Sequence, residues 1–200
     1  MVRASYRLGQ LGLALSPLVP ARDRALAAAL LTPPQLAAFG LLAPTDQRHA
    51  ARVLRALLTR GERDADLLVA ALLHDLGKAD PQGLGRVRLP HRVSKVLARR
   101  LAPGFWDWIS VRPGRGPLHG YYLLRQHPAL GAAWAARLGV APRACALIAV
   151  HQDGDIRGSL TSLEGDVSAS QSIAAGVGPR RDAGEFARVL AALRWADDRA

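Results

Sequence analysis

The chain has 200 residues, half of them hydrophobic, and a formal net charge of +11. This length suits one domain, or one domain with a small appendage, and the apolar fraction is large enough for a sizeable core. A single cysteine, Cys145, excludes an internal disulfide and fits a reducing compartment, so we expect a cytoplasmic protein. The most apolar early stretch, from Leu8 to Leu31, is interrupted by prolines and charges. No segment reaches the roughly 20 apolar residues that a membrane span needs, so we expect no membrane partner.

The positive charge comes almost entirely from arginine. Lys78 and Lys95 are the only lysines among the 27 basic residues. A basic surface favours anionic partners, phosphorylated small molecules included, without distinguishing them from nucleic acid. The sequence carries no nucleic-acid-binding motif, so nucleic acid is an allowed but not a favoured partner. The basic residues are densest at Arg86, Arg88, Arg92, Lys95, Arg99 and Arg100.

Apolar residues recur three and four positions apart from end to end, and strict alternation is absent, so we expect an all-α protein. Prolines that suit a first helical turn begin two short helices, at 20–31 and 33–42. A third helix over 46–60, capped by Thr45 or Asp46 and stopped by Gly61, is followed by a fourth over 64–75. We expect residues 1–44 to form an N-terminal helical extension packed on a core domain that covers 45–200.

The second half of the chain continues this helical pattern with two interruptions. A fifth helix over 90–101 precedes a segment rich in Pro, Gly and Trp, which predicts a loop over 102–117. Pro128 restricts the residue before it, so we expect two short helices around His127 instead of one long helix. A helix over 142–151 and a final helix over 184–200 flank a stretch rich in Gly, Ser and Asp, which predicts a long loop over 152–184.

Polar side chains lie on helix faces that are otherwise apolar. His49 shares its face with Val53 and Leu57, and a buried imidazole or carboxylate of this kind needs a partner, which can be a cation. A lone histidine on an apolar face is most often a hydrogen-bonded core residue, and a single aspartate at a fraying helix end is often only a polar residue. The whole set is hard to explain by packing alone and indicates one or two divalent metals. Its members are His49, His74 with the adjacent Asp75, His127, His151 and Asp197.

Two histidines remain outside this set. We expect His91 to be solvated, because it lies with Lys95 on the polar side of its helix. His119 is either a ligand in place of His127 or a contact to the substrate. The apolar residues expected to face inward from the helix of His91 are Val93, Val96 and Leu97.

Five pieces of the chain, spread over about 45–198, follow the order of a known family pattern. The most specific is Leu-Leu-His-Asp-Leu-Gly-Lys at 72–78. The others are His49 after Gln47-Arg48, His-Pro-Ala-Leu-Gly-Ala at 127–132, His151, and Asp197 after Trp195-Ala196. Together they resemble the HD superfamily of metal-dependent phosphohydrolases. The resemblance implies a single-domain helical bundle in which metals are held between helices.

The resemblance also implies roles for individual residues. In the family pattern His49, His74, Asp75 and Asp197 bind one metal, His127 and His151 hold a second, and Asp75 bridges the two. Lys78 matches a family lysine that lies beside the site and contacts phosphate. The branch that cleaves cyclic dinucleotides carries Gly-Tyr-Pro after a His-His pair, whereas His151 is followed here by Gln152 and Asp153. This difference argues against cyclic-di-GMP as the substrate.

Imidazole and carboxylate ligands suit Mn, Fe, Co, Ni or Zn. A bound divalent cation lowers the pKa of its water from about 15.7 towards about 7, and the hydroxide can attack phosphorus. We therefore expect a phosphohydrolase, either a phosphomonoesterase or a phosphodiesterase, that cleaves an ester of a nucleotide or another small phosphorylated molecule. Asp75 and Lys78 are its expected catalytic residues. The side chains expected at the substrate are Lys78, Arg86, Arg88, Arg92 and His119.

Two alternatives use the same residues differently. The first is a non-catalytic helical module of HD type that binds a nucleotide or a protein partner. The second is a basic protein associated with nucleic acid, with or without phosphodiesterase activity. A decayed site would usually have lost some of the six ligands, and all six are present. The salt dependence of binding to random DNA would distinguish the second alternative.

Overall fold

The structure is a computed structural model that describes residues 18–83, 85–114, 116–152 and 180–200. Helices and turns make up these residues, apart from one isolated backbone bridge between Ala79 and Arg86. The expected all-α class is therefore confirmed. The α-helices are α2 (Ala21–Leu30), α3 (Pro33–Gly40), α4 (Pro44–Thr59), α5 (Ala65–Leu73), α6 (Leu89–Leu101), α7 (Pro103–Ser110), α8 (His119–Arg137), α9 (Pro142–Val150) and α12 (Arg180–Asp197). Two short 3₁₀ helices are η1 (Leu76–Lys78) and η2 (Gly116–Leu118).

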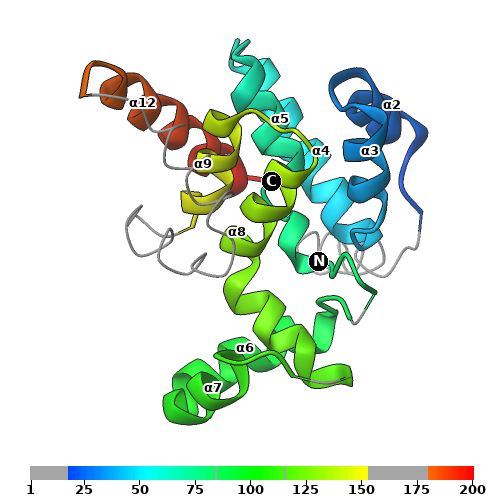
Figure 1. The fold of residues 1–200 in the computed structure, drawn as a ribbon, viewed down its shortest axis with the longest axis vertical. Helices are drawn as coiled ribbons and strands as arrows, with labels where there is room; N and C mark the ends of the chain where they lie inside the picture. Colours follow the sequence, from blue (N-terminus) through cyan, green and yellow to red (C-terminus); the bar gives the residue numbers. More distant parts are fainter. Residues whose placement is uncertain (1–17, 84, 115, 153–179) are drawn as a thin grey trace, which may run out of the picture.

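One continuous cluster of buried apolar side chains holds most of the bundle together. Figure 1 shows α5, α8 and α9 in the middle of the molecule, with α2 and α3 on one side and α12 on the other. Ala27 of α2 and Phe39 of α3 belong to this cluster, together with side chains of α4, α5, α8, α9 and α12. Residues 18–44 therefore share the main core instead of forming a core of their own.

A second, smaller cluster attaches α6 and α7 to the first half of α8. It contains Val87, Trp106, Leu123 and Leu124, and Figure 1 shows α6 and α7 at the lower end of the molecule. The expectation of a loop over 102–117 was wrong for 103–110, which form α7. Pro103 occupies the first turn, where a missing N–H leaves no hydrogen bond unmade, and Trp106 buries itself against α8.

Helix α8 runs unbroken through Pro128, so the expectation of two short helices was also wrong. A proline inside a helix leaves the carbonyl four residues earlier without its usual N–H donor. Here that carbonyl belongs to Leu124, and Nδ1 of His127 lies 3.1 Å from it. The histidine side chain replaces the missing backbone donor, which lets the helix continue and fixes the direction of the ring.

Helix α6 is turned differently from the expected orientation. His91 is buried, and both ring nitrogens are satisfied there: Nδ1 accepts from the Arg88 N–H, and Nε2 donates to the Pro117 carbonyl at 2.8 Å. Its ring lies against Gly120, where a Cβ atom would be 2.5 Å away. The apolar residues expected to face inward, Val93, Val96 and Leu97, are instead exposed. The expected burial was wrong because α6 is attached by hydrogen bonds, from His91 to Pro117 of η2 and between Ser94 and Tyr121 of α8, and not by Val93, Val96 and Leu97.

Three smaller points concern the remaining expectations. Helix α4 begins at Pro44 with Ala43 as its cap, so neither Thr45 nor Asp46 caps it. Residues 153–179 of the expected loop lie outside the described residues, and α12 already begins at Arg180. Among the helices that the structure describes, none combines the length and apolar character needed to cross a bilayer.

Candidate metal site

Five helical segments bring the six expected ligands to one place. His49 comes from the middle of α4, His74 and Asp75 follow α5, and the others come from α8, the end of α9 and the last residue of α12. Ring centroids are 5.4 Å apart for His49 and His74, 5.1 Å for His74 and His151, and 5.4 Å for His127 and His151. Within each of three overlapping groups, the donor atoms lie within 4.8 Å of one another. The groups are His49–His74–Asp75, His74–His151–Asp197 and Asp75–His127–His151.

Three of the imidazoles are oriented by the same device. Nδ1 of His74 lies 2.9 Å from the Ala71 carbonyl, and Nδ1 of His151 lies 2.7 Å from the Ile148 carbonyl. These carbonyls belong to the last turns of α5 and α9, where backbone acceptors lack a partner within the helix. His127 makes the corresponding bond to the carbonyl released by its neighbouring proline. In all three rings the proton therefore sits on Nδ1, and Nε2 keeps a lone pair that can bind a metal.

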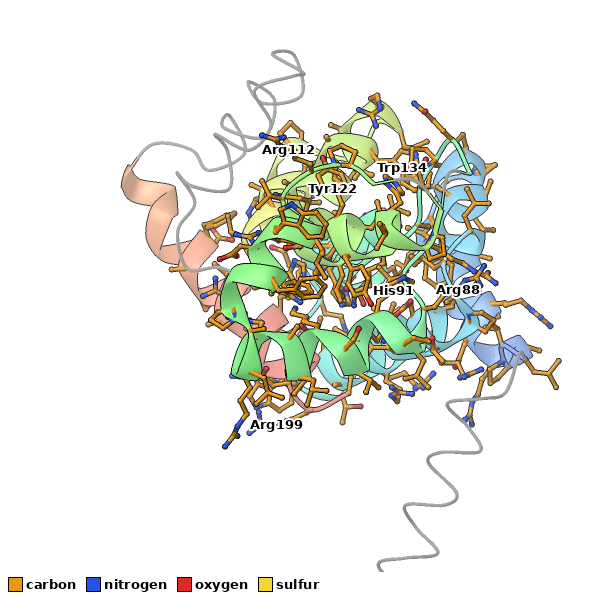
Figure 2. The ribbon with its side chains drawn as sticks, turned by 90° about the horizontal axis from the view of Figure 1, so that it is seen from below. Arg88, His91, Arg112, Tyr122, Trp134 and Arg199 are labelled. Atoms are coloured by element: carbon orange, nitrogen blue, oxygen red, sulfur yellow. The ribbon has the colours of Figure 1, made fainter. Side chains whose placement is uncertain are left out.

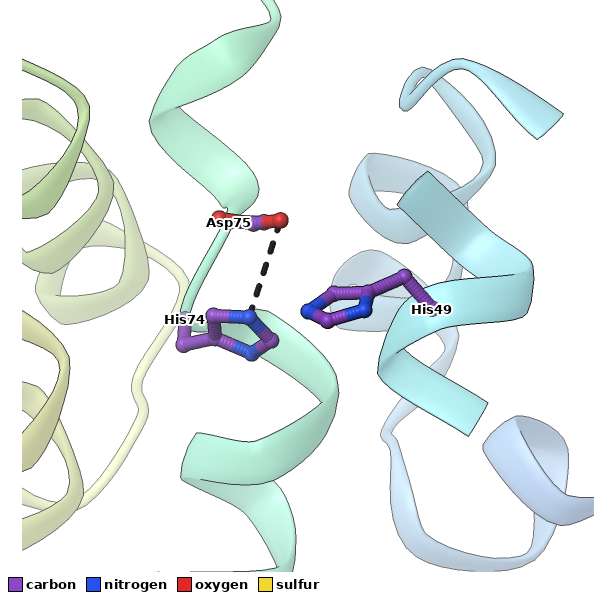
Figure 3. Close-up of side chains that lie close together, drawn as sticks. All are labelled: His49, His74 and Asp75. Carbon is purple, nitrogen blue, oxygen red and sulfur yellow. Dashed lines mark ion pairs between the residues drawn. The ribbon is translucent and has the colours of Figure 1, made fainter. Parts of the chain in front are cut away.

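The two carboxylates lie between the rings. Oδ1 of Asp75 is 3.6 Å from Nε2 of His127, and its Oδ2 is 3.6 Å from Nε2 of His74. Asp197 Oδ1 lies 2.7 Å from Nε2 of His49 and 3.5 Å from Nε2 of His74. Figure 3 shows the His49 ring facing His74 and Asp75 across the gap between α4 and α5. Asp75 thus stands between two histidines, as a bridging ligand would.

Four polar atoms at this place are buried and have no hydrogen-bond partner among the described residues. They are Nε2 of His74, His127 and His151, and Oδ1 of Asp75. An unsatisfied buried polar atom costs about 1–3 kcal/mol, so four in one cluster would be a large penalty for a purely structural core. Two trios share Asp75, and their imidazole nitrogens and carboxylate oxygens fit one or two divalent transition metals.

The electrostatics keep these groups in the ionisation states that metal ligands need. Burial lowers the pKa of His151 to about 4, and burial with the nearby Lys78 ammonium lowers the pKa of His127 well below its usual value. Burial opposes ionisation of Asp75, but Lys78 and the histidines outweigh it and hold the pKa of Asp75 well below its usual range. Two imidazoles are therefore neutral and the carboxylate is charged at neutral pH.

The remaining ring and carboxylate respond to each other. Burial lowers the pKa of His74, but the attraction of Asp75 and Asp197 outweighs it, so the pKa of His74 is raised. Burial would raise the pKa of Asp197, but hydrogen bonds from His49 and His74 lower it strongly. The two carboxylates therefore attract positive charge to this point, whether it is a proton on His74 or a cation.

A short chain of charges leads from the cluster to α6. Lys78 Nζ lies 2.6 Å from Asp75 Oδ2 and 4.0 Å from Asp46 Oδ1, and Arg92 of α6 forms an ion pair with Asp46. The Asp46 side chain is 2% exposed, so both cations are needed to compensate its buried charge. We did not identify Asp46 from the sequence. Its position three residues before His49, on the same helix face, was the available signal.

Glycines allow the backbone carrying Asp75 to approach α8. A Cβ on Gly77 would lie 2.3 Å from the His127 carbonyl oxygen and 2.7 Å from the Gly131 nitrogen. A Cβ on Gly131 would in turn lie 2.9 Å from the Gly77 nitrogen. The backbones of η1 and α8 therefore touch at two glycines, and this contact places His127 next to Asp75.

The other expected substrate residues lie at different places. Arg86 and Arg88 are exposed, and Arg92 is held by Asp46. His119 is buried, with Nε2 2.8 Å from Asp80 Oδ2, and it belongs to none of the three donor groups. The structure therefore brings together the six expected ligands and Lys78, and it places His119 in a separate pair with Asp80.

Comparisons of this chain with protein-family models, with curated proteins and with solved structures found no match. The interpretation of the site therefore depends on its own residues.

Proposed function

We propose that the protein is a metal-dependent phosphohydrolase of the HD type, which cleaves a phosphate ester of a nucleotide or another small phosphorylated molecule. One observation carries the proposal. Three imidazoles, each oriented by an Nδ1–H bond to a helix carbonyl, direct Nε2 atoms without a hydrogen-bond partner towards the same buried carboxylate, and His127 and His151 among them are neutral. A packed core would leave such atoms uncompensated, whereas one or two divalent cations would compensate them.

Two overlapping sets of residues would hold metal. His49, His74 and Asp197 would hold one cation with Asp75, and His127 and His151 a second, although His151 also lies within reach of His74 and Asp197. A divalent cation in such a site supplies a hydroxide nucleophile at neutral pH, because it lowers the pKa of a coordinated water to about 7. Asp75 stays ionised and joins the two sets. His49 and Asp197 are each 23% exposed, so the site opens to solvent on their side.

Lys78 is the residue of this chain best placed to bind the substrate phosphate. Its ammonium pairs with Asp75 through one oxygen, and its side chain remains 13% exposed. An ammonium has three donors, so Lys78 can keep this pair and also donate to a phosphate oxygen. Its positive charge then offsets the charge that develops on the phosphate during attack. Asp46, itself paired with Arg92, lies 4.0 Å from the Lys78 ammonium and helps to hold it in position.

The first test is metal content together with hydrolysis. Purified protein is analysed for bound metals and then assayed with Mn, Co, Fe, Ni and Zn on mononucleotides, dinucleotides and simple phosphate esters. We expect bound transition metal and metal-dependent release of nucleoside, nucleotide or phosphate. Asp75→Ala is expected to lose both the metal and the activity. A wild-type protein that binds metal but remains inert on the whole panel would favour the non-catalytic module.

A matched pair of histidine variants separates the site from general packing. His151→Gln removes one buried imidazole of the cluster, and His119→Gln removes an equally buried imidazole outside the donor groups. We expect metal content to fall in His151→Gln and to stay at the wild-type level in His119→Gln. A loss of activity with unchanged metal in the second variant would assign His119 to the substrate. Equal metal content in all three proteins would contradict the proposed site.

A further inference from the structure

Helix α6 presents an apolar stripe to solvent. Leu89, Val93, Val96, Leu97 and Leu101 are between 52% and 71% exposed. At 100° per residue these five side chains fall within an arc of about 140°, which is the pattern of a helix that buries one face. The face that α6 does turn to the protein carries His91, Ser94 and Ala98. The stripe is therefore a second face, separate from the one that attaches the helix.

A row of cations borders this stripe on one side. Arg88, Arg92, Lys95 and Arg99 follow one another at helical spacing within an arc of about 60°. Arg92 is paired with the buried Asp46, whereas Arg88 and Arg99 are exposed. Arg100 lies within the stripe itself, where a long side chain can lay its carbons along an apolar surface and keep its charge at the edge. Helix α6 contains no acidic residue. The helix thus combines a strongly basic edge with a wide apolar face.

Helix α7, which follows α6 directly in the chain, also exposes aromatic side chains. Only Ala102 separates it from α6, and Phe105 and Trp108 are 55% and 74% exposed, with ring centroids 6.0 Å apart. Figure 2 looks at the molecule from the end where α6 and α7 lie and labels Arg88 and His91 at the start of α6. Aromatic side chains of this kind are enriched where apolar and aqueous phases meet.

We propose that α6 and α7 bind the surface of an anionic lipid bilayer, with the apolar stripe in the acyl boundary and the basic row at the headgroups. A helix that is basic on one side and apolar on the other, followed by a helix with exposed aromatic side chains, matches the two layers of such a surface. This binding needs no membrane span. Binding to a membrane surface departs from the expectation of no membrane partner, which rested on the absence of a membrane-spanning segment.

Two other partners, a second copy of the chain and nucleic acid, fit this face less well. A second copy of the chain in a symmetric dimer would bring the same basic helix against itself, and like charges would oppose the contact. Nucleic acid would pair with the basic row but leave the apolar stripe exposed to water. An anionic bilayer satisfies both features together, because acyl chains lie directly beneath its charged headgroups.

The test is flotation of the full-length protein with phosphatidylcholine vesicles that contain or lack phosphatidylserine. We expect binding to the anionic vesicles, weaker binding at high salt, and little binding to pure phosphatidylcholine. The double variant Val96→Gln/Leu97→Gln is expected to lower the partition coefficient by about tenfold or more, since it removes two membrane-facing side chains. Leu41→Gln, at a similarly exposed leucine of another surface, is the matched control and should bind like wild type.

Charge reversal tests the basic edge separately. Arg99→Glu changes the charge at the surface by two units and is expected to weaken binding by about thirtyfold, whereas Arg24→Glu on α2 should change it little. Trp108 supplies a spectroscopic readout, because its emission should shift to the blue on anionic vesicles and the shift should disappear in Trp108→Phe. The assays contain no substrate, so their outcome is independent of the proposed hydrolysis.

Three results would overturn the proposal. They are wild-type protein that stays unbound on anionic vesicles, a double variant that binds like wild type, and a Leu41→Gln control that loses as much binding. A fourth result would come from light scattering, which measures self-association. Self-association that the Val96/Leu97 substitutions abolish would assign the face to a contact between copies of the chain.

Discussion

Gly77→Ala perturbs the contact that places His127 beside Asp75. The added Cβ would meet the His127 carbonyl oxygen at 2.3 Å, and ordinary contact begins at 3.4 Å, so the two backbones must separate by about 1.1 Å. The two nearest atoms, the His127 carbonyl oxygen and the Gly131 nitrogen, belong to the backbone of α8. They cannot turn aside as the end of a flexible side chain would. We expect a loss of about 1–3 kcal/mol in the free energy of unfolding. In the proposed hydrolase, a displacement of about 1 Å would also be enough to reduce activity by about a hundredfold.

Urea denaturation measures the first effect and metal-dependent hydrolysis the second, and a metal titration of the same preparation shows whether the donor atoms still bind an ion. Gly104→Ala is the matched control, because it adds the same atom inside α7, where no atom lies within 4 Å of the new Cβ. Alanine is favoured over glycine inside a helix, so this control should be neutral or more stable by up to about 1 kcal/mol. If Gly77→Ala unfolds at the same urea concentration as wild type and binds metal equally well, the close approach of η1 and α8 does not position the site.

Three further predictions concern other parts of the molecule. Asp64→Asn removes an ion pair with Arg143 and keeps an acceptor for the Leu67 N–H. Burial would raise the pKa of Asp64, but the Leu67 N–H and Arg143 outweigh it and lower this pKa, so the charged carboxylate stabilises the fold above pH 3.8 and loses its effect as pH falls further. Urea denaturation should show a deficit of about 0.5–1 kcal/mol at pH 7 that shrinks below about pH 4, and a pH-independent deficit would contradict this account. Arg92→Met should lower the free energy of unfolding by about 2 kcal/mol, because it leaves the buried Asp46 charge without one of its partners. Asp46→Asn removes that charge and should cost less, and the reverse order in denaturation curves would refute this reasoning. Burial raises the pKa of the Cys145 thiol to about 12, so a thiol reagent at pH 8 should react only after unfolding, and rapid labelling of the native protein would show that the thiol is accessible.

Periodicity in the sequence was enough to predict most of the helices and the inward direction of the site residues. Helices α4, α5 and α9 follow the predicted ranges closely, because each carries an apolar face that the core covers. The position of polar residues on those faces predicted that His49, His74 and His151 would be buried or half-buried among apolar side chains. Their convergence on Asp75 depends on how five segments pack, and no spacing along the chain determines that.

The failures have physical causes that the pattern does not contain. An apolar stripe on α6 indicates a face that avoids water, but it does not say whether the protein itself covers that face. The helix is instead attached through the hydrogen bonds of His91 to Pro117 and of Ser94 to Tyr121. Pro128 normally ends a helix, but the side chain of His127 supplies the donor that the proline lacks. Asp46 was interpreted as a cap, although its partners Lys78 and Arg92 are distant in the sequence.

The central claim is that the Nε2 atoms of His74, His127 and His151 bind metal together with Asp75. Anomalous diffraction from crystals grown with Co²⁺ or Mn²⁺ tests it most directly. The account predicts one or two anomalous peaks at about 2.0–2.2 Å from these nitrogens and from a carboxylate oxygen of Asp75. Saturating metal with no peak at this cluster, or peaks only at surface carboxylates elsewhere, would contradict it.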